Sequence, residues 1–136
     1  MMIKQIKKIS EKDACSRILH NPQELCIVNI DDIKESTRKT NQYYFYVDFV
    51  MEDGTQFGVS YSFYKEDGEF KCGTQSKLYY LLKGFLDLNE LECVGLTFDK
   101  SDIDETLLNK KFNASAFVQN VGGEKYIYLM CEKVVE

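Results

Sequence analysis

The amino-acid sequence predicts a mainly antiparallel β domain with one or two helices. Two pairs of β-rich runs each surround a short turn, at Glu52-Asp53-Gly54 and at Gly122-Gly123. Between these pairs, the apolar residues change to a helical period near Ser76. The 136 residues fit one domain, whose core is large enough to be stable without disulfides or metal.

The first predicted strand lies in ELCIVNIDDIKES, residues 24–36, where a β-rich apolar run becomes polar and charged. A loop with two positive charges, TRKTNQ, follows it. The next two strands form the hairpin of residues 41–64, NQYYFYVDFVMEDGTQFGVSYSFY. A polar segment with two glycines, KEDGEFKCGTQ, then leads to the helix.

Two registers are open to this first hairpin, and a shift of one residue exchanges the two faces of a strand. A two-residue loop would place Asp48 on the most aromatic face, which makes a poor core. A three-residue loop, Glu52-Asp53-Gly54, instead pairs Met51 with Thr55 and gives one apolar face and one amphipathic face. We therefore predict the second register. Its apolar face holds Phe45, Val47, Phe49, Phe57, Val59, Tyr61 and Phe63, and its outer face holds Tyr44, Tyr46 and Asp48 beside Ser60 and Ser62.

The predicted helix begins near Ser76, and either Thr74 or Ser76 is expected to cap its first turn. Lys77 and Lys83 are expected on its outer side. The apolar stripe that predicts the helix follows the spacing i, i+3, i+4 and i+7 and consists of Leu78, Leu81, Leu82 and Phe85.

After the helix, LECVGLTFDK is expected to extend as a short strand, and SDIDETLL to form a short turn capped by Ser101 and Asp104. The last hairpin joins KFNASAFVQN to KYIYLMCEKVV through a two-residue Gly122-Gly123 turn. This turn predicts the pairs Val118–Ile127, Ala116–Leu129 and Ala114–Cys131, and it places Phe117, Tyr126 and Tyr128 on the other face.

The order of elements is three strands, a helix and two more strands. This is the order of the OB-fold, a five-stranded Greek-key β-barrel with a helix between strands 3 and 4. We predict an OB-like domain over residues 23–136, preceded by an N-terminal arm or short helix over residues 1–22. The alternative fold is an α+β domain with a helix packed on a sheet.

Two segments, TQSKLYYLLKGFL and DIDETLLNKKFNASAFVQNVGGEKYIYLM, resemble OB-fold proteins carried by phages and other mobile elements of bacteria. In those proteins a Ser-Lys-Leu-Tyr-x-x-Leu-Lys helix precedes a short acidic turn, a Leu-Ile-Gly-Lys step and a final hairpin with a Gly-Lys turn. The resemblance covers about residues 74–133. Asn109 stands where glycine is usual before Lys110, and the turn here reads Gly123-Glu124-Lys125. The resemblance implies a single-stranded nucleic-acid-binding protein or a replication accessory factor.

Composition limits the possible functions. The net charge of −5 argues against a strongly basic, phosphate-driven binder, although it allows a local basic patch. The five cysteines are widely spaced, without a Cys-x-x-Cys pair, which favours free thiols in a reducing compartment. The N-terminal residues lack the apolar region of a secretory signal, and no run is apolar enough for a membrane span. We therefore expect a cytoplasmic protein.

Single-stranded nucleic acid needs rings for base stacking and cations for phosphates. In an OB-fold these belong on strands 2 and 3 and on the loops between strands 1–2 and 4–5. The sequence places seven such candidates there or at the start of strand 4: Arg38, Lys39, Tyr44, Tyr46, Lys111, Lys125 and Tyr126. An ordinary solvated loop and the β-propensity of tyrosine explain the same residues without a ligand.

The second functional hypothesis is a protein-interaction or assembly module, including a homodimer. Phe117 and Tyr128 are its candidate interface residues, because apolar groups on an outer face often mark interfaces. The same rings would also fit under the N-terminal arm. We expect no catalytic residues, no cofactor and no metal site, since His20 is the only histidine and no Cys/His spacing suggests a metal.

Overall fold

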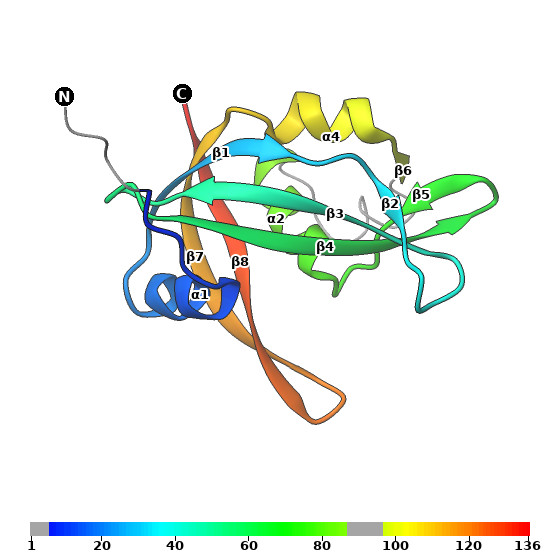
Figure 1. Ribbon diagram of the computed structural model, residues 1–136, viewed down its shortest axis with the longest axis horizontal. Helices are drawn as coiled ribbons and strands as arrows, with labels where there is room; N and C mark the ends of the chain where they lie inside the picture. The colour runs from blue at the N-terminus through cyan, green and yellow to red at the C-terminus, as the bar shows by residue number, and fades with distance from the viewer. Residues whose placement is uncertain (1–5, 87–96) are drawn as a thin grey trace.

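The computed structural model describes residues 6–86 and 97–136 and consists of one antiparallel sheet with helices packed around it (Figure 1). Its helices are α1 (Glu11–His20), α2 (Lys77–Leu86) and α4 (Lys100–Leu107). Its strands are β1 (Gln23–Ile30), β2 (Lys34–Glu35), β3 (Gln42–Val50), β4 (Gln56–Glu66), β5 (Glu69–Lys71), β6 (Thr97–Phe98), β7 (Lys111–Val121) and β8 (Glu124–Val135).

The strands follow one another across the sheet in the order β6-β5-β4-β3-β1-β7-β8, and β2 pairs with β3 beside β1. This confirms a mainly antiparallel β domain with helices. The sheet has eight strands where five were expected, because β2, β5 and β6 are added. No strand ladder joins β4 to β8 in the described residues, so the sheet is not closed into a barrel.

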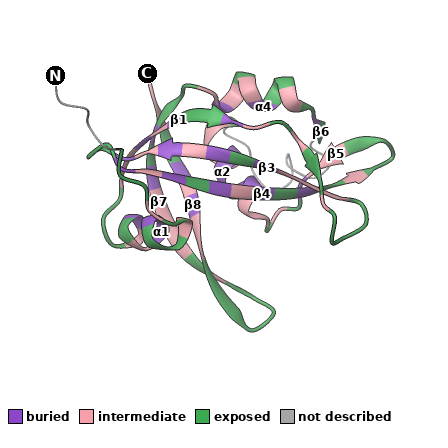
Figure 2. Cartoon of the chain, in the orientation of Figure 1, coloured by how far each residue is buried: buried purple, intermediate pink, exposed green. Residues whose placement is uncertain are grey.

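The β3–β4 hairpin has the register of the three-residue loop. Met51 N–H donates to Thr55 O at 2.8 Å, and Gly54 N–H donates to Met51 O at 2.9 Å. Gly54 has φ 87°, a left-handed conformation that glycine adopts without strain. The pairs Phe49–Phe57, Val47–Val59 and Phe45–Tyr61 are buried on the inner face, which gives the alternating burial of both strands in Figure 2.

The β7–β8 hairpin also has its predicted register. The pairs Val118–Ile127, Ala116–Leu129 and Ala114–Cys131 are all present, and the turn residues Gly122 and Gly123 both have positive φ. Small alanines on β7 opposite larger residues on β8 leave room for the neighbouring core.

Helix α2 packs directly on the backbone of β8. A Cβ atom at Gly84 would lie 1.9 Å from the carbonyl oxygen of Cys131, so only glycine permits this approach. Leu78, Leu81 and Leu82 are buried as predicted. The cap is Ser76, whose Oγ accepts the N–H of Tyr79 at 3.1 Å.

The N-terminal segment is tied to the sheet before α1 begins. Gln56 N–H donates to Lys7 O at 2.9 Å, and Ile9 N–H donates to Gln56 O at 3.0 Å. Ser10 then caps α1, which buries Ala14, Cys15 and Ile18 and packs against β4, β7 and β8. An amphipathic helix therefore covers one end of the sheet.

Helix α4 replaces the short turn expected after residue 100, and its cap lies earlier than predicted. Asp99 accepts the N–H of Asp102 at 2.9 Å, and Asp102 accepts the N–H of Asp99 at the same distance. Ser101 is therefore inside the helix, and Asp104 pairs with Lys100. The expected strand LECVGLTFDK lies mostly outside the described residues, and β6 is its described part.

Candidate functional site

Two adjoining hollows lie between β4 and β8, the two strands that do not pair. The first has a volume of about 670 Å³ and the second about 310 Å³, and both are lined by Lys77 and Tyr128. We call them together the trough. Its first part is lined by Lys39–Gln42, Ser60, Ser62–Tyr64, Gly73 and Ser76, and its second part by Glu11, Lys12, Cys15 and Lys125–Ile127.

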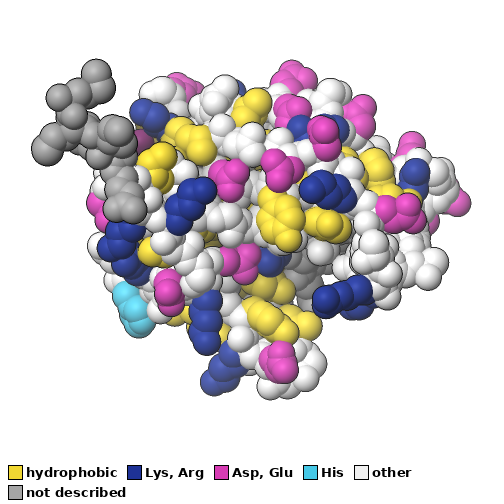
Figure 3. Space-filling view, viewed as in Figure 1, with side chains coloured by type: hydrophobic (Ala, Val, Ile, Leu, Met, Phe, Trp, Pro, Cys, Tyr) yellow, Lys and Arg dark blue, Asp and Glu magenta, His cyan; other side chains and the backbone are white. Residues whose placement is uncertain are grey.

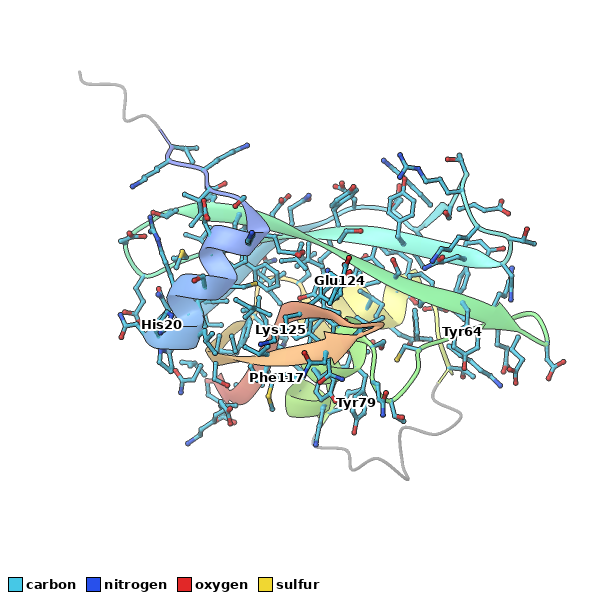
Figure 4. All side chains as sticks on the ribbon, turned by 90° about the horizontal axis from the view of Figure 1, so that it is seen from below. His20, Tyr64, Tyr79, Phe117, Glu124 and Lys125 are labelled. Carbon is cyan, nitrogen blue, oxygen red and sulfur yellow. The ribbon has the colours of Figure 1, made fainter. Side chains whose placement is uncertain are left out.

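Five segments of the chain form the walls of the trough. The loop before β3 and the strand β4 form one side, and α1, the start of α2 and the start of β8 form the others. Figure 4 views the molecule from below, with Tyr64 labelled toward the end of β4 and Glu124 and Lys125 at the start of β8. In Figure 1 the β7–β8 hairpin projects from the body on this side.

Lys77 fixes the middle of the trough. Its Nζ donates to the backbone oxygen of Ser60 at 2.9 Å and pairs with Glu11 at 3.1 Å, and it lies 5.8 Å from the ring centre of Tyr61. Lys77 therefore connects α2 to both β4 and α1. The prediction that Lys77 lies on the outer side of its helix is wrong, because the neighbouring strand and α1 cover that side.

Three further lysines line the trough and are exposed: Lys12, Lys39 and Lys125. None of them makes an ion pair with another described residue. Among the described lining residues, Glu11 is the one carboxylate, and it is paired with Lys77. The trough therefore has a net positive lining in a protein whose overall charge is negative.

Exposed tyrosine rings line both parts of the trough. Tyr64 is 38% exposed on β4, and Tyr126 is 45% exposed on β8. The Tyr126 hydroxyl donates to Glu124 Oε2 at 2.7 Å, and this bond together with the charge of Glu124 raises the pKa of Tyr126. Tyr128 between them is half-buried. Exposed rings of this kind offer flat surfaces for stacking.

Of the seven residues predicted for nucleic-acid binding, the trough includes three. Lys39 lines its first part, and Lys125 and Tyr126 line its second part. Arg38 is exposed in the same loop as Lys39 but is not part of the lining. The structure thus brings the two predicted loops to one surface.

Tyr44 and Tyr46 lie on the outer face of β3, beside the trough. They pair with Ser62 and Ser60 of β4, and their ring centres are 5.7 Å apart at a steep angle. Figure 3 shows hydrophobic side chains over the middle of β3 with both basic and acidic groups around them. Tyr46 is 44% exposed, whereas Tyr44 is half-buried.

The outer face of β3 becomes acidic at one end. Asn29 donates through its amide to Asp31 and Asp48, at 3.0 Å each, and thus holds the two carboxylates close together. These charges would repel a phosphate that approached Tyr46 from this end. The outer face of β3 is therefore electrostatically unlike the trough.

Lys111 lies far from the other candidates. It begins β7, while Lys125 pairs with Asn120 nine residues further along that strand. At about 3.3 Å per residue, roughly 30 Å separate the two lysines. One short ligand in the trough does not reach Lys111.

The candidate interface residues contact α2. Tyr80 lies 4.7 Å from the ring centre of Phe117 and 6.2 Å from that of Tyr128. The ring of Phe117 therefore packs against α2 rather than under the N-terminal arm. Both rings remain half-buried, and their role in a dimer stays a prediction.

Four features of the trough were not predicted from the sequence: Lys12, Tyr64, Lys77 and the free edge of β4. The position of Tyr64 could have been predicted, because the alternation of side chains along β4 places it on the same face as Ser60 and Ser62. No sequence pattern could have predicted the contacts of Lys77, because its partners Glu11 and Ser60 are far from it in the sequence.

No protein-family model matches the chain, and no curated protein matches it. The resemblance to phage OB-fold proteins therefore stays a prediction.

Residues 6–86 and 97–136 contain no group of three or more His, Cys, Asp or Glu side chains suited to a metal ion. Within these residues, no helix has the length and apolar character to cross a membrane.

Proposed function

We propose that the protein is an OB-type module that binds single-stranded DNA or RNA in the trough. The observation that carries the proposal is the meeting of two distant segments at the adjoining hollows of the trough, with Lys39 from the loop before β3 and Lys125 and Tyr126 from the start of β8. In OB-folds the corresponding loops, between strands 1–2 and 4–5, frame the ligand. The strand order β4-β3-β1-β7-β8, with α2 between β4 and β7, supports the same assignment.

The charged and the aromatic residues of the trough suit the two chemical components of a single-stranded nucleic acid, its phosphates and its bases. Lys12, Lys39 and Lys125 attract phosphates, and Tyr64 and Tyr126 offer their faces to bases. Stacking contributes about 1–3 kcal/mol per base, so two rings supply more free energy than three exposed charges do at moderate salt. Bases in a duplex are stacked on one another and unavailable to the rings, so we expect the protein to prefer single strands.

Fluorescence anisotropy with a labelled oligonucleotide at low salt tests the proposal. We expect saturable binding, tighter for a single strand than for the same sequence as a duplex. The logarithm of the affinity should fall with the logarithm of salt concentration by about 0.7 for each phosphate contacted. Absence of binding at protein concentrations of about 10⁻⁴ M, where even non-specific binders associate, would refute the proposal.

A second candidate function is a protein-interaction module, supported by the exposed end of the β7–β8 hairpin. Val118 and Val121 are each 46% exposed there. Analytical ultracentrifugation distinguishes this function: a dimer that Tyr128→Glu or Val118→Glu dissociates would support it. A monomer at high concentration, with both variants unchanged in mass, would argue against self-association.

A further inference from the structure

Among the described residues, no strand pairs with the edge of β4 that faces the trough. The backbone N–H and C=O groups of successive residues in a strand point to opposite edges, so residues two apart use the same edge. The N–H and C=O of Gln56 form hydrogen bonds with the N-terminal segment, on the side of β4 away from β3. Tyr64 pairs with Lys71 of β5 on the same side. Ser60 and Ser62 therefore also direct their backbone groups away from β3. The bond from Lys77 to Ser60 O confirms this direction.

Three of these backbone groups have no hydrogen-bond partner among the described residues: Ser60 N–H, Ser62 N–H and Ser62 C=O. Both serines line the first part of the trough. The edge thus offers donors and an acceptor side by side, in positions fixed by the β3–β4 ladder. Groups on the same edge repeat every two residues, about 6.8 Å.

This mixture of donors and an acceptor selects the part of a nucleic acid that can face it. A phosphate only accepts hydrogen bonds, so Ser62 C=O would repel it. The edges of nucleobases carry donors and acceptors together. Phosphates belong instead beside Lys39, whose ammonium group is exposed and unpaired with any described carboxylate.

We propose that the free edge of β4 at Ser60 and Ser62 hydrogen-bonds nucleobases, with the phosphates turned toward the lysines of the trough. This inference rests on the proposed function and adds the way in which the bound strand is oriented. Tyr64, two residues beyond Ser62 on the same face, is placed to stack on a base held at this edge. The trough then reads bases through the main chain and not only through charge.

The first arm of the test compares two ligands of equal charge, an oligothymidylate and an abasic oligonucleotide of the same length. We expect the wild-type protein to bind the abasic chain about tenfold more weakly or worse, because both stacking and the edge bonds are lost. Equal affinity for the two ligands would overturn the inference while leaving the proposed function in place. Failure to bind either ligand would refute the proposed function itself.

The second arm removes one donor from the edge. Ser62→Pro lacks the outward N–H and does not disturb the pairing with β3, since proline is tolerated on a free strand edge. We expect a loss of about fivefold in affinity for oligothymidylate and no loss for the abasic chain. The matched reference is Ser62→Ala, which also loses the hydroxyl but keeps the N–H, so the loss is measured as the difference between these two variants. Losses of equal size for Ser62→Pro on both ligands would overturn the inference.

Circular dichroism with thermal unfolding establishes whether Ser62→Pro is folded, and if it is not, Ser60→Pro, which removes the other outward N–H, takes its place in the second arm. An acidic peptide, octaglutamate, serves as a competitor because an extended peptide also carries donors and acceptors. We expect it not to displace the oligonucleotide at equal charge concentration. Displacement that Ser62→Pro abolishes would assign the edge to a peptide strand and overturn the inference.

Discussion

The outer face of β3 and the trough both expose tyrosines, yet they differ in charge and in backbone pairing. Tyr44 and Tyr46 sit on a strand whose two edges are paired, by β1 and β2 on one side and by β4 on the other. Asp31 and Asp48 lie at one end of that face. The trough combines its rings with exposed lysines and with a strand edge that no described strand pairs. Rings alone therefore do not distinguish a stacking surface from an ordinary strand face, but the groups beside them do.

The largest expected effect comes from the contact that seats α2 against β8 and so shapes the trough. Gly84→Ala places a methyl group against the carbonyl oxygen of Cys131, 1.9 Å away before any relaxation. We expect a loss of about 3 kcal/mol or more in the free energy of unfolding, measured by urea denaturation, because backbone must move. The control is Gly73→Ala, where no atom lies within 4 Å of the added group and stability should be nearly unchanged. Equal stability of the two variants would contradict the α2–β8 contact.

The tyrosines provide the most direct comparison of the two regions. We expect Tyr64→Ala combined with Tyr126→Ala to lower the affinity for a single-stranded oligonucleotide by at least about tenfold, since stacking contributes about 1–3 kcal/mol per base. Tyr44→Ala combined with Tyr46→Ala should have a smaller effect. The measurement is fluorescence anisotropy at fixed salt. A larger loss from the β3 pair would move the binding surface to the outer face of β3.

The salt dependence of binding distinguishes the lysines of the trough from a distant lysine. Lys39→Ala combined with Lys125→Ala should reduce the slope of log affinity against log salt by about 1.4, two phosphates at about 0.7 each. Lys111→Ala, roughly 30 Å from Lys125, should leave the slope unchanged. If all three substitutions reduced the slope equally, binding would depend on total charge and not on the trough.

The smallest expected effect concerns the α1 wall of the trough. Burial raises the pKa of the Cys15 thiol to about 12, so at pH 8 the thiol is protonated and unreactive. We expect iodoacetamide to modify Cys15 at least about tenfold more slowly than the half-buried Cys26, as followed by site-resolved mass spectrometry. Rapid modification of Cys15 would show that α1 leaves the sheet in solution.

Sequence alternation was sufficient to predict both hairpins. In β3–β4 the position of Asp48 excluded one register, and in β7–β8 the glycine pair set the turn, because local side-chain chemistry determines both. The cap of α4 was misplaced since Asp99, which begins the helix, was counted with the preceding strand. Local sequence thus predicts the register of a hairpin more accurately than the ends of a helix.

The trough could not be predicted from patterns in the sequence. Its walls come from α1, β4, α2 and β8, and Lys77 joins three of them through Glu11 and Ser60 O. Whether β4 and β8 pair depends on how the helices fill the space between them, and no periodicity encodes this. The loop lysines were found because the OB-fold order indicates where such loops meet.

Photocrosslinking tests the central claim, that a single strand lies in the trough and not across β3, most directly. An oligothymidylate containing 4-thiothymidine is bound, irradiated and mapped to individual residues by tandem mass spectrometry. A strand bound in the trough is expected to crosslink at Tyr64, Tyr126 or Tyr128, all of which line the trough. Crosslinks confined to Tyr44 and Tyr46 would contradict it.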